Sequence, residues 1–186
     1  MTERTDAALV EQCLGGQQEA FAELLRRYQD RVFHFSLRIT GDRDEAVDLA
    51  QETFIRAYRK LRLYDPEYSF GTWLLSVCAN LGKNRFRSET RRRKAQNIHA
   101  EMLAQTSSGS DHRREALSEA LGEMVEKLRL PLVLKHVEGL SYEEIAQVLG
   151  IRVSAAKMRV KRARDELVRV LGGRKGSSNE KTRRLD

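Results

Sequence analysis

The stretch that decides the fold is LSYEEIAQVLGIRVSAAKMRVKRARDELVRVL, from Leu140 to Leu171. It predicts two helices joined by a tight turn. Ser141 and Glu144 stand at the spacing of a capping box, which would start the first helix. Gly150 can adopt the left-handed backbone conformation that the turn requires. Ser154 is expected to cap the second helix. The stretch therefore has the pattern of a helix-turn-helix.

The second of these helices is expected to be apolar on one face and basic elsewhere. Its apolar stripe has alternating spacings of four and three residues, which is typical of an amphipathic helix: Ala156, Val160, Ala163, Leu167 and Val170. A recognition helix meets base edges with its N-terminal residues and phosphates with flanking cations. The cations here are concentrated in the first turns, so DNA binding is favoured over the alternative, a solvated amphipathic hairpin.

Composition agrees with a nucleic-acid partner. The chain has 186 residues and a formal net charge of +7, which favours a polyanionic partner although such a charge can also serve solubility. Cys13 and Cys78 form no Cys-x-x-Cys pair, so neither zinc ligation nor a disulfide framework is indicated. We find no signal-peptide core and no apolar run of about 18 residues, so no membrane insertion is expected. These features predict a cytoplasmic location.

The hydrophobic period is near 3.6 throughout, which predicts an all-α protein. We expect two small helical domains joined by a flexible linker, the C-terminal one a helix-turn-helix. The first domain would cover residues 1–87, with a short helix near its start and three longer amphipathic helices. The linker would cover 88–113, where apolar positions are few. At roughly 3.3 Å per residue it could reach about 85 Å when fully extended. The second domain would cover 114–171, and 172–186 would be a disordered basic tail.

Two further motifs show a resemblance to a known family. DRDEAVDLAQETFIRAYRKL, from Asp42 to Leu61, is followed by FGTWLLSVCANLGKNRFR, from Phe70 to Arg87, and then by the helix-turn-helix. This order resembles the small two-domain sigma factors of bacterial RNA polymerase, the extracytoplasmic-function (ECF) group of the sigma-70 family. The resemblance implies a subunit that binds core RNA polymerase and directs promoter recognition and DNA melting, in a stress or envelope response. A freestanding helix-turn-helix regulator is the alternative, and a nucleic-acid enzyme is a distant third.

The resemblance assigns the Asp42–Leu61 segment to docking. Its acidic residues would repel DNA, and without the resemblance they could simply form a solvated face. In sigma factors this helix docks on a coiled coil of the large polymerase subunit, where acidic side chains meet cations and apolar ones fill the interface. Carried over by motif, the docking candidates are Asp48, Leu49, Gln51, Glu52 and Phe54.

The next helix, expected from Thr72 to Arg87, is the family's reader of the downstream promoter element, the minus-ten element. Holding a melted strand requires cations for phosphates, aromatic faces for bases and amides for base edges. The candidates are Asn80, Lys83, Asn84, Arg85 and Arg87, with Tyr64, Tyr68 and Phe70 in or beside the preceding loop. Asn80 is the preferred contact for a flipped base. Trp73 lies on the apolar stripe, so a core role is favoured. Many relatives carry an acidic residue where this chain has Asn84.

For the upstream promoter element, the minus-thirty-five element, the candidates are Ser154, Lys157, Met158, Arg159, Lys161 and Arg162. The family often has Gly-Thr-Val-Lys-Ser-Arg where this chain has Ser154 to Arg159, so sequence preference should differ. Met158 could contact a thymine methyl or take a packing role. Relatives are commonly inhibited by an anti-sigma factor that wedges between the domains, and the linker here would allow it.

Other chemistry is not indicated. The histidines, His34, His99, His112 and His136, are scattered and show no metal-ligand spacing. No phosphate-binding loop or nucleophile elbow is present, so we expect no enzyme activity and no cofactor.

Overall fold

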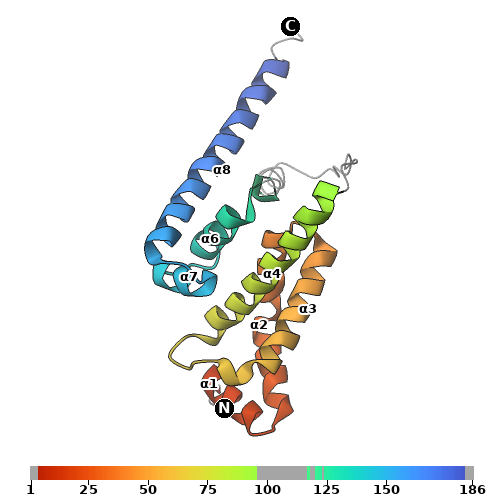
Figure 1. Cartoon of the computed structure of the whole chain (residues 1–186), viewed down its shortest axis with the longest axis vertical. Helices are drawn as coiled ribbons and strands as arrows, with labels where there is room; N and C mark the ends of the chain where they lie inside the picture. Colours follow the sequence, from red (N-terminus) through yellow and green to blue (C-terminus); the bar gives the residue numbers. More distant parts are fainter. Residues whose placement is uncertain (1–3, 96–116, 118–119, 123, 183–186) are drawn as a thin grey trace.

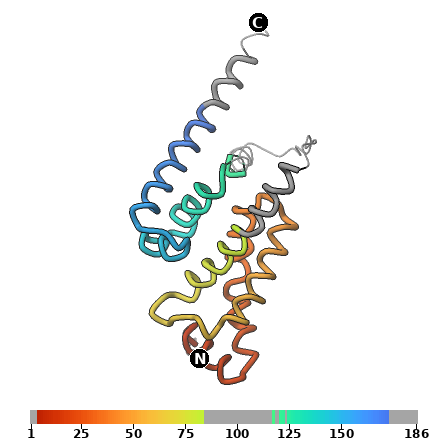
Figure 2. The backbone as a smooth tube through the Cα atoms, viewed as in Figure 1, coloured from red at the N-terminus to blue at the C-terminus, as the bar shows by residue number. Residues whose placement is uncertain are grey.

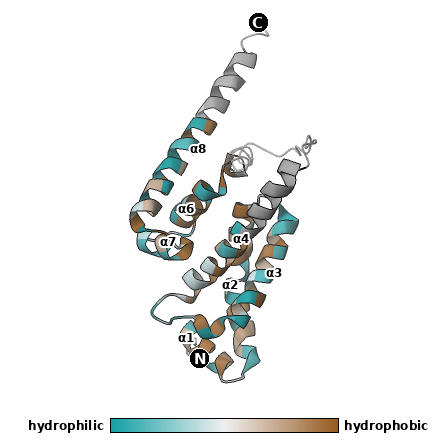
Figure 3. Cartoon of the chain, viewed as in Figure 1, coloured by the Kyte–Doolittle hydropathy of each residue, from teal (hydrophilic) through white to brown (hydrophobic). Residues whose placement is uncertain are grey.

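The computed structural model describes residues 4–95, 117, 120–122 and 124–182, with side chains described except at 84–95 and 173–182. Throughout this part of the chain the backbone forms helices and the turns between them, as the all-α prediction requires (Figure 1). The hydropathy colouring alternates between hydrophobic and hydrophilic positions along the helices (Figure 3). This alternation is what amphipathic helices around a shared core produce.

The first domain is built from four α-helices and one 3-10 turn. They are α1 (Asp6–Leu14), α2 (Gln18–Thr40), α3 (Arg43–Arg59), η1 (Leu61–Leu63) and α4 (Phe70–Ala95). In Figure 1, α2, α3 and α4 lie side by side, and α1 crosses their lower end. Their apolar stripes meet in a core that includes Leu24, Phe35, Ile39, Leu49 and Leu74, all fully buried.

Local sequence signals fix the boundary between α2 and α3. Gly41 ends α2 in the left-handed conformation, with φ of 78°, and donates its N–H to the Leu37 carbonyl. Asp42 then caps α3, because its side chain accepts a hydrogen bond of 2.9 Å from the Glu45 N–H. Glycine and aspartate are residue types favoured in these two roles at helix ends. The resulting sharp turn places α3 antiparallel to α2.

The second domain contains α6 (Glu126–His136), α7 (Tyr142–Leu149) and α8 (Val153–Thr182). The predicted capping box is confirmed, since the Ser141 hydroxyl accepts from the Glu144 N–H at 3.1 Å and the Glu144 carboxylate accepts from the Ser141 N–H at 2.8 Å. Gly150 has φ of 63° and turns the chain into α8. The helix-turn-helix is therefore formed by α7 and α8.

Three boundaries differ from those predicted. α8 begins at Val153, so Ser154 is its second residue and does not cap it. α4 continues to Ala95, into the segment predicted to be a flexible linker, and α8 continues to Thr182, into the segment predicted to be a disordered tail. Adding a residue to an existing helix needs no new nucleus. The α4 extension is rich in Arg, a good helix former, whereas the α8 extension continues through three glycines. Residues 96–113 and 183–186, which complete those two predicted segments, lie outside the described residues, as do residues 114–116.

The two domains pack against each other. One hydrophobic cluster contains Leu74 and Leu75 of α4 together with Leu134 of α6 and Ile145 of α7. The backbone tube in Figure 2 places the α6–α7 pair beside α2 and α4, with α8 extending away from the first domain. Burial of these side chains removes apolar surface from water on both sides of the domain boundary, which stabilises the packed arrangement.

Candidate polymerase and DNA contact surfaces

An open apolar groove of about 490 Å³ runs between α2 and α3. Phe33 and Leu25 of α2 form one wall, and Val47 and Ile55 of α3 form the other. Val47 is 37% exposed and Ile55 is 53% exposed, which is high for large apolar side chains on helices that otherwise bury such residues. Exposed apolar side chains gathered in a concave surface favour a protein partner. We call this surface the α2–α3 groove.

The predicted docking residues divide around this groove. Asp48 and Gln51 are exposed and Glu52 is half-buried. Phe54 is 7% exposed and lines the groove. Leu49 is fully buried in the core of the first domain, so its prediction as a surface contact is wrong. Motif transfer identifies a helix but does not tell which of its sides faces the core.

The sequence reasoning missed Val47 and Ile55. Their exposed apolar side chains are the strongest sign of a contact surface on α3. The hydrophobic periodicity of α3 did indicate their exposure, because both residues lie off its buried stripe. That stripe consists of Ala46, Leu49, Ala50 and Ala57. An apolar residue on the solvent side of an amphipathic helix is the feature that would have found them.

The start of α3, from which the chain leads into the groove residues, is acidic. Asp42, Asp44 and Asp48 at the start of α3 are exposed. Carboxylates in the first turn of a helix interact favourably with its positive N-terminal end. Arg43 is the cation among them, and its guanidinium lies over the Phe33 ring, 5.5 Å from the centroid. The groove is thus apolar at its centre and mainly acidic at the start of α3.

An aromatic cluster closes the loop before α4. The Tyr64 ring lies 5.4 Å from Phe70 and 5.5 Å from Trp73 between ring centroids, and Phe70 lies 5.5 Å from Trp73. Tyr64 also donates its hydroxyl to the Tyr68 carbonyl at 2.7 Å. Burial raises the pKa of the Tyr64 hydroxyl, so it stays a donor at neutral pH. These contacts hold the loop in a defined shape.

The members of this cluster differ in exposure. Tyr68 is 43% exposed and Tyr64 is half-buried, so both offer ring surface. Phe70 is 1% exposed, so the prediction that it helps to enclose a base is wrong, and it is a core residue at the start of α4. Trp73 is half-buried and packs against the hydrophobic core, as predicted. Its remaining surface lines a cavity of about 180 Å³ together with Tyr68 and with Val148 of α7.

Farther along α4, Asn80 is exposed and Lys83 is half-buried. The Lys83 ammonium donates to the Asn80 side-chain carbonyl at 3.4 Å and to the Leu149 backbone carbonyl at 3.1 Å. It therefore connects the predicted base-contacting amide with the end of α7. Asn84, Arg85 and Arg87 belong to the same helix, but their side chains lie outside the described part of the structure.

The start of α8 presents most of its predicted upstream-element residues to solvent. Ser154, Lys157, Met158, Lys161 and Arg162 are exposed, and Arg159 is half-buried. Met158 is 51% exposed, so it takes no core packing role in this arrangement. The Lys157 ammonium lies 5.7 Å from the centroid of the Tyr142 ring, which supports it from α7. Arg159 points instead into a cavity between α4, α6 and the α7–α8 turn.

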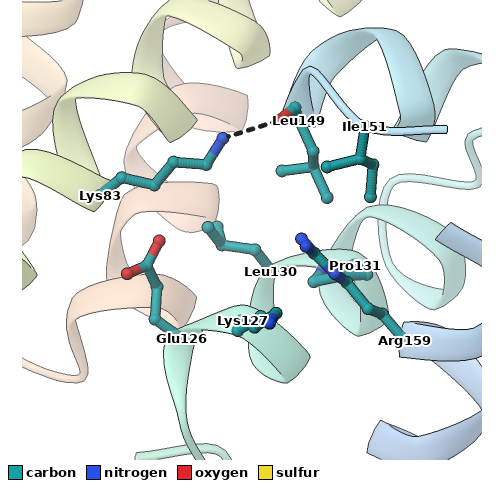
Figure 4. Close-up of a pocket in the computed structure, with 8 residues that line it drawn as sticks. All are labelled: Lys83, Glu126, Lys127, Leu130, Pro131, Leu149, Ile151 and Arg159. Atoms are coloured by element: carbon teal, nitrogen blue, oxygen red, sulfur yellow. Dashed lines mark hydrogen bonds between the residues drawn. The ribbon is translucent and has the colours of Figure 1, made fainter. Parts of the chain in front are cut away.

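That cavity measures about 400 Å³ and is shown in Figure 4. Lys83 approaches it from α4, Glu126 and Leu130 from α6, and Arg159 from α8. Figure 4 also shows the hydrogen bond from Lys83 to the Leu149 carbonyl at its upper edge. Thus Lys83 and Arg159, one predicted for each promoter element, line the same cavity between the domains.

Among the described residues, no group of three or more His, Cys, Asp or Glu side chains is arranged to hold a metal ion. Within the same residues, no helix is long and apolar enough to cross a membrane.

Comparison with known proteins identifies the family. The Sigma-70 region 2 model matches residues 24–92, and the Sigma-70 region 4 model matches residues 114–167. The ECF RNA polymerase sigma-E factor of Haemophilus influenzae is 34% identical over 175 residues, covering 87% of this chain and 92% of the relative. The chain is an extracytoplasmic-function sigma factor. The RNA polymerase sigma-H factor of Pseudomonas aeruginosa is 32% identical over 185 residues, covering 92% of this chain and 96% of the relative.

Solved structures agree with this assignment. CnrH, solved in complex with the cytosolic domain of CnrY, is 27% identical with a TM-score of 0.67, covering 90% of this chain and 97% of CnrH. The Bartonella quintana sigma factor RpoE, solved with the anti-sigma factor NepR, has a TM-score of 0.70 at 24% identity and shows the same fold. As an ECF sigma factor, this chain directs transcription initiation. The freestanding regulator is not favoured, and the family is not one of enzymes.

Proposed function

We propose that this sigma factor docks on core RNA polymerase through the α2–α3 groove. The observation that carries the proposal is the exposed apolar pair Val47 and Ile55 beside the acidic start of α3. A polymerase surface with apolar side chains and flanking cations would fill the groove and pair with Asp48 and Glu52. Apolar burial would supply most of the affinity, while the charges would orient and speed the encounter.

The start and middle of α4, with the loop before it, would read and hold the melted minus-ten element. Asn80 supplies an exposed amide for a base edge, and Tyr64 and Tyr68 supply partly exposed aromatic rings for stacking. Lys83, with the helix positions of Asn84, Arg85 and Arg87, would meet the phosphates. On this proposal, the residues that melt the promoter and hold the single strand belong to the domain of residues 1–87. The C-terminal turns of α4 extend that domain.

The start of α8 would read the minus-thirty-five element as duplex DNA. Lys157, Lys161 and Arg162 are exposed on its first turns, where a recognition helix enters the major groove. Met158, exposed between them, would contact a thymine methyl group. Residues 114–171 would thus be the upstream reading unit. The protein would act in the cytoplasm, where the polymerase and the promoters are.

A regulatory partner is part of the proposal. CnrH was solved with the cytosolic domain of CnrY, and the Bartonella quintana sigma factor was solved with an anti-sigma factor. We expect an anti-sigma factor to bind this chain as well and to compete with core polymerase.

Multi-round transcription with purified core polymerase on promoters from the source genome tests the proposed function. The full chain should support specific starts, and no specific start on any promoter would overturn the proposal.

Ile55→Asp places a charge in the groove and should weaken core binding by about tenfold or more, because it removes apolar burial and desolvates a carboxylate. The binding constant can be measured by fluorescence anisotropy with labelled sigma factor.

Leu14→Asp is the matched control, since Leu14 is 44% exposed on α1, away from the groove. It should bind core polymerase as the unaltered chain does. Equal binding by Ile55→Asp and Leu14→Asp would remove the groove from the docking surface.

A further inference from the structure

The cavity of about 400 Å³ between α4, α6 and the α7–α8 turn has an apolar and a charged part (Figure 4). The apolar lining residues are Leu130, Pro131, Leu149 and Ile151. The charged lining residues are Lys83, Glu126, Lys127 and Arg159. Small-molecule sites in proteins have this range of volume and this kind of lining, mainly apolar with a few polar groups that fix the ligand. The cavity is therefore suited to a small molecule.

The charges around the cavity are mainly positive. Lys83, Lys127 and Arg159 approach it from three different helices, whereas Glu126 is the acidic member of the described lining. The Glu126 carboxylate also acts on Arg129, which is 3% exposed on the same helix. Burial lowers the pKa of the Arg129 guanidinium and the charge of Glu126 raises it, so this carboxylate already serves a neighbouring cation. The cavity is left with an excess of positive charge, which attracts anions.

The N-terminal end of α6 adds to this positive potential. Glu126 and Lys127 are the first two residues of this 11-residue helix, and both line the cavity. Val125 stands at the N-cap and has no side-chain oxygen to accept from the first N–H groups. The N-terminal end of a helix carries a partial positive charge and favours anionic groups. The backbone and the side chains therefore favour the same kind of ligand.

The two parts of the lining call for a ligand with two parts. Lysine ammonium groups and arginine guanidinium groups bind phosphates through charge-assisted hydrogen bonds, and arginine can bind in a bidentate manner. The apolar residues would cover a ring and remove it from water. An inorganic anion would leave the apolar lining uncovered, and an apolar molecule would leave the cations without an anion. A nucleotide joins phosphates to a ring within one small molecule.

We infer that this cavity binds a nucleoside diphosphate, with its phosphates between Lys127 and Arg159 and its ring against Leu130 and Ile151. Lys83, which is fixed by its 3.1 Å hydrogen bond to the Leu149 carbonyl, faces the same ligand from α4. The inference goes beyond the proposed function, in which Lys127 has no role. It requires neither polymerase nor DNA, so the free chain suffices to test it.

Isothermal titration calorimetry of the full chain with adenosine diphosphate tests the inference. Pyrophosphate and adenosine, titrated at the same ionic strength, represent the two parts of the ligand. Adenosine diphosphate should bind saturably, with one molecule per chain. Its affinity should exceed that of either part by about tenfold or more, because each part alone leaves either the apolar lining or the cations uncovered.

Variants of the lining locate the site. Lys127→Ala and Arg159→Ala should each weaken binding of adenosine diphosphate by about tenfold, because each removes a charge-assisted hydrogen bond. The matched controls are Lys60→Ala at the end of α3 and Arg164→Ala on α8, which remove the same residue types from exposed positions outside the cavity lining. Both controls should bind as the unaltered chain does. Because Lys127 is exposed, its substitution should leave the fold intact, which circular dichroism checks.

A variant of the apolar lining tests the place of the ring. Ile151→Trp would fill part of the cavity without changing its charge, so it should weaken binding of adenosine diphosphate more than binding of pyrophosphate. The inference would be overturned by an absence of saturable binding, by equal affinities for adenosine diphosphate and pyrophosphate, or by equal losses in the cavity variants and their controls. Failure of the proposed function is separate, since it appears as absent transcription whatever the calorimetry shows.

Discussion

At the scale of single residues, Asn80 carries the sharpest prediction about promoter opening. Its side chain is exposed on α4, and its carbonyl oxygen accepts only the long bond from Lys83 among the contacts described above. Asn80→Ala should lower open-complex formation by about 10- to 100-fold, since a specific amide–base contact contributes about 1–3 kcal/mol. Permanganate reactivity of unpaired thymines measures this step. Core binding should stay intact, and Glu11→Ala on α1 is the control. Normal opening by Asn80→Ala would exclude the assigned contact.

Residue roles were predicted unevenly from sequence. Trp73 was placed in the core because it lies on an apolar stripe, and its packing confirms this. Leu49 and Phe70 were carried over from family motifs as contact residues and are buried in the core instead. Periodicity reports which side of a helix is apolar. It cannot assign a motif residue to a partner when that partner and the core both require apolar side chains.

At the scale of elements, the capping box of α7 yields a stability prediction with an internal control. Ser141→Ala removes the hydroxyl that accepts from the Glu144 N–H and should lower the free energy of unfolding by about 1 kcal/mol. Ser154 sits in the first turn of α8 without capping it, so Ser154→Ala should change stability by less than about 0.5 kcal/mol. Urea denaturation monitored by circular dichroism compares the two. Equal losses would mean that Ser154 caps α8 after all.

Elements were the best-predicted level of this fold. The turn at Gly150 and the cap at Ser141 were read from local chemistry, and each is found as expected. The far ends of α4 and α8 were not. No proline or glycine marks a stop in the α4 extension, α8 continues through the Gly172-Gly173 pair, and helix propagation depends on small summed propensities. The packing of the domains could not be predicted, since it joins Arg31 to Glu138 across more than a hundred residues.

At the scale of the whole molecule, the net charge of +7 makes salt dependence an informative measurement. Lys157→Ala and Arg162→Ala should each weaken holoenzyme binding to the upstream element. Each should also reduce the slope of log affinity against log salt by about 0.9, since one counterion fewer is released per lost phosphate contact. Arg38→Ala, on α2 in the first domain, is the control. It removes one positive charge, as the α8 variants do, but should leave this slope unaltered. An unchanged slope in the α8 variants would argue against phosphate contacts there.

Both native thiols are buried, so their rates of alkylation report on the folding of the first domain. Cys78 is fully buried within the first domain and lies 3.3 Å from the Ser36 hydroxyl of α2. Burial raises the pKa of the Cys13 thiol, which further slows its alkylation. Separating the domains leaves the α2 partner of Cys78 in place, whereas unfolding the first domain exposes the thiol. The alkylation rate of Cys78 should therefore measure how often the first domain unfolds. It should not depend on whether the two domains are packed together or apart.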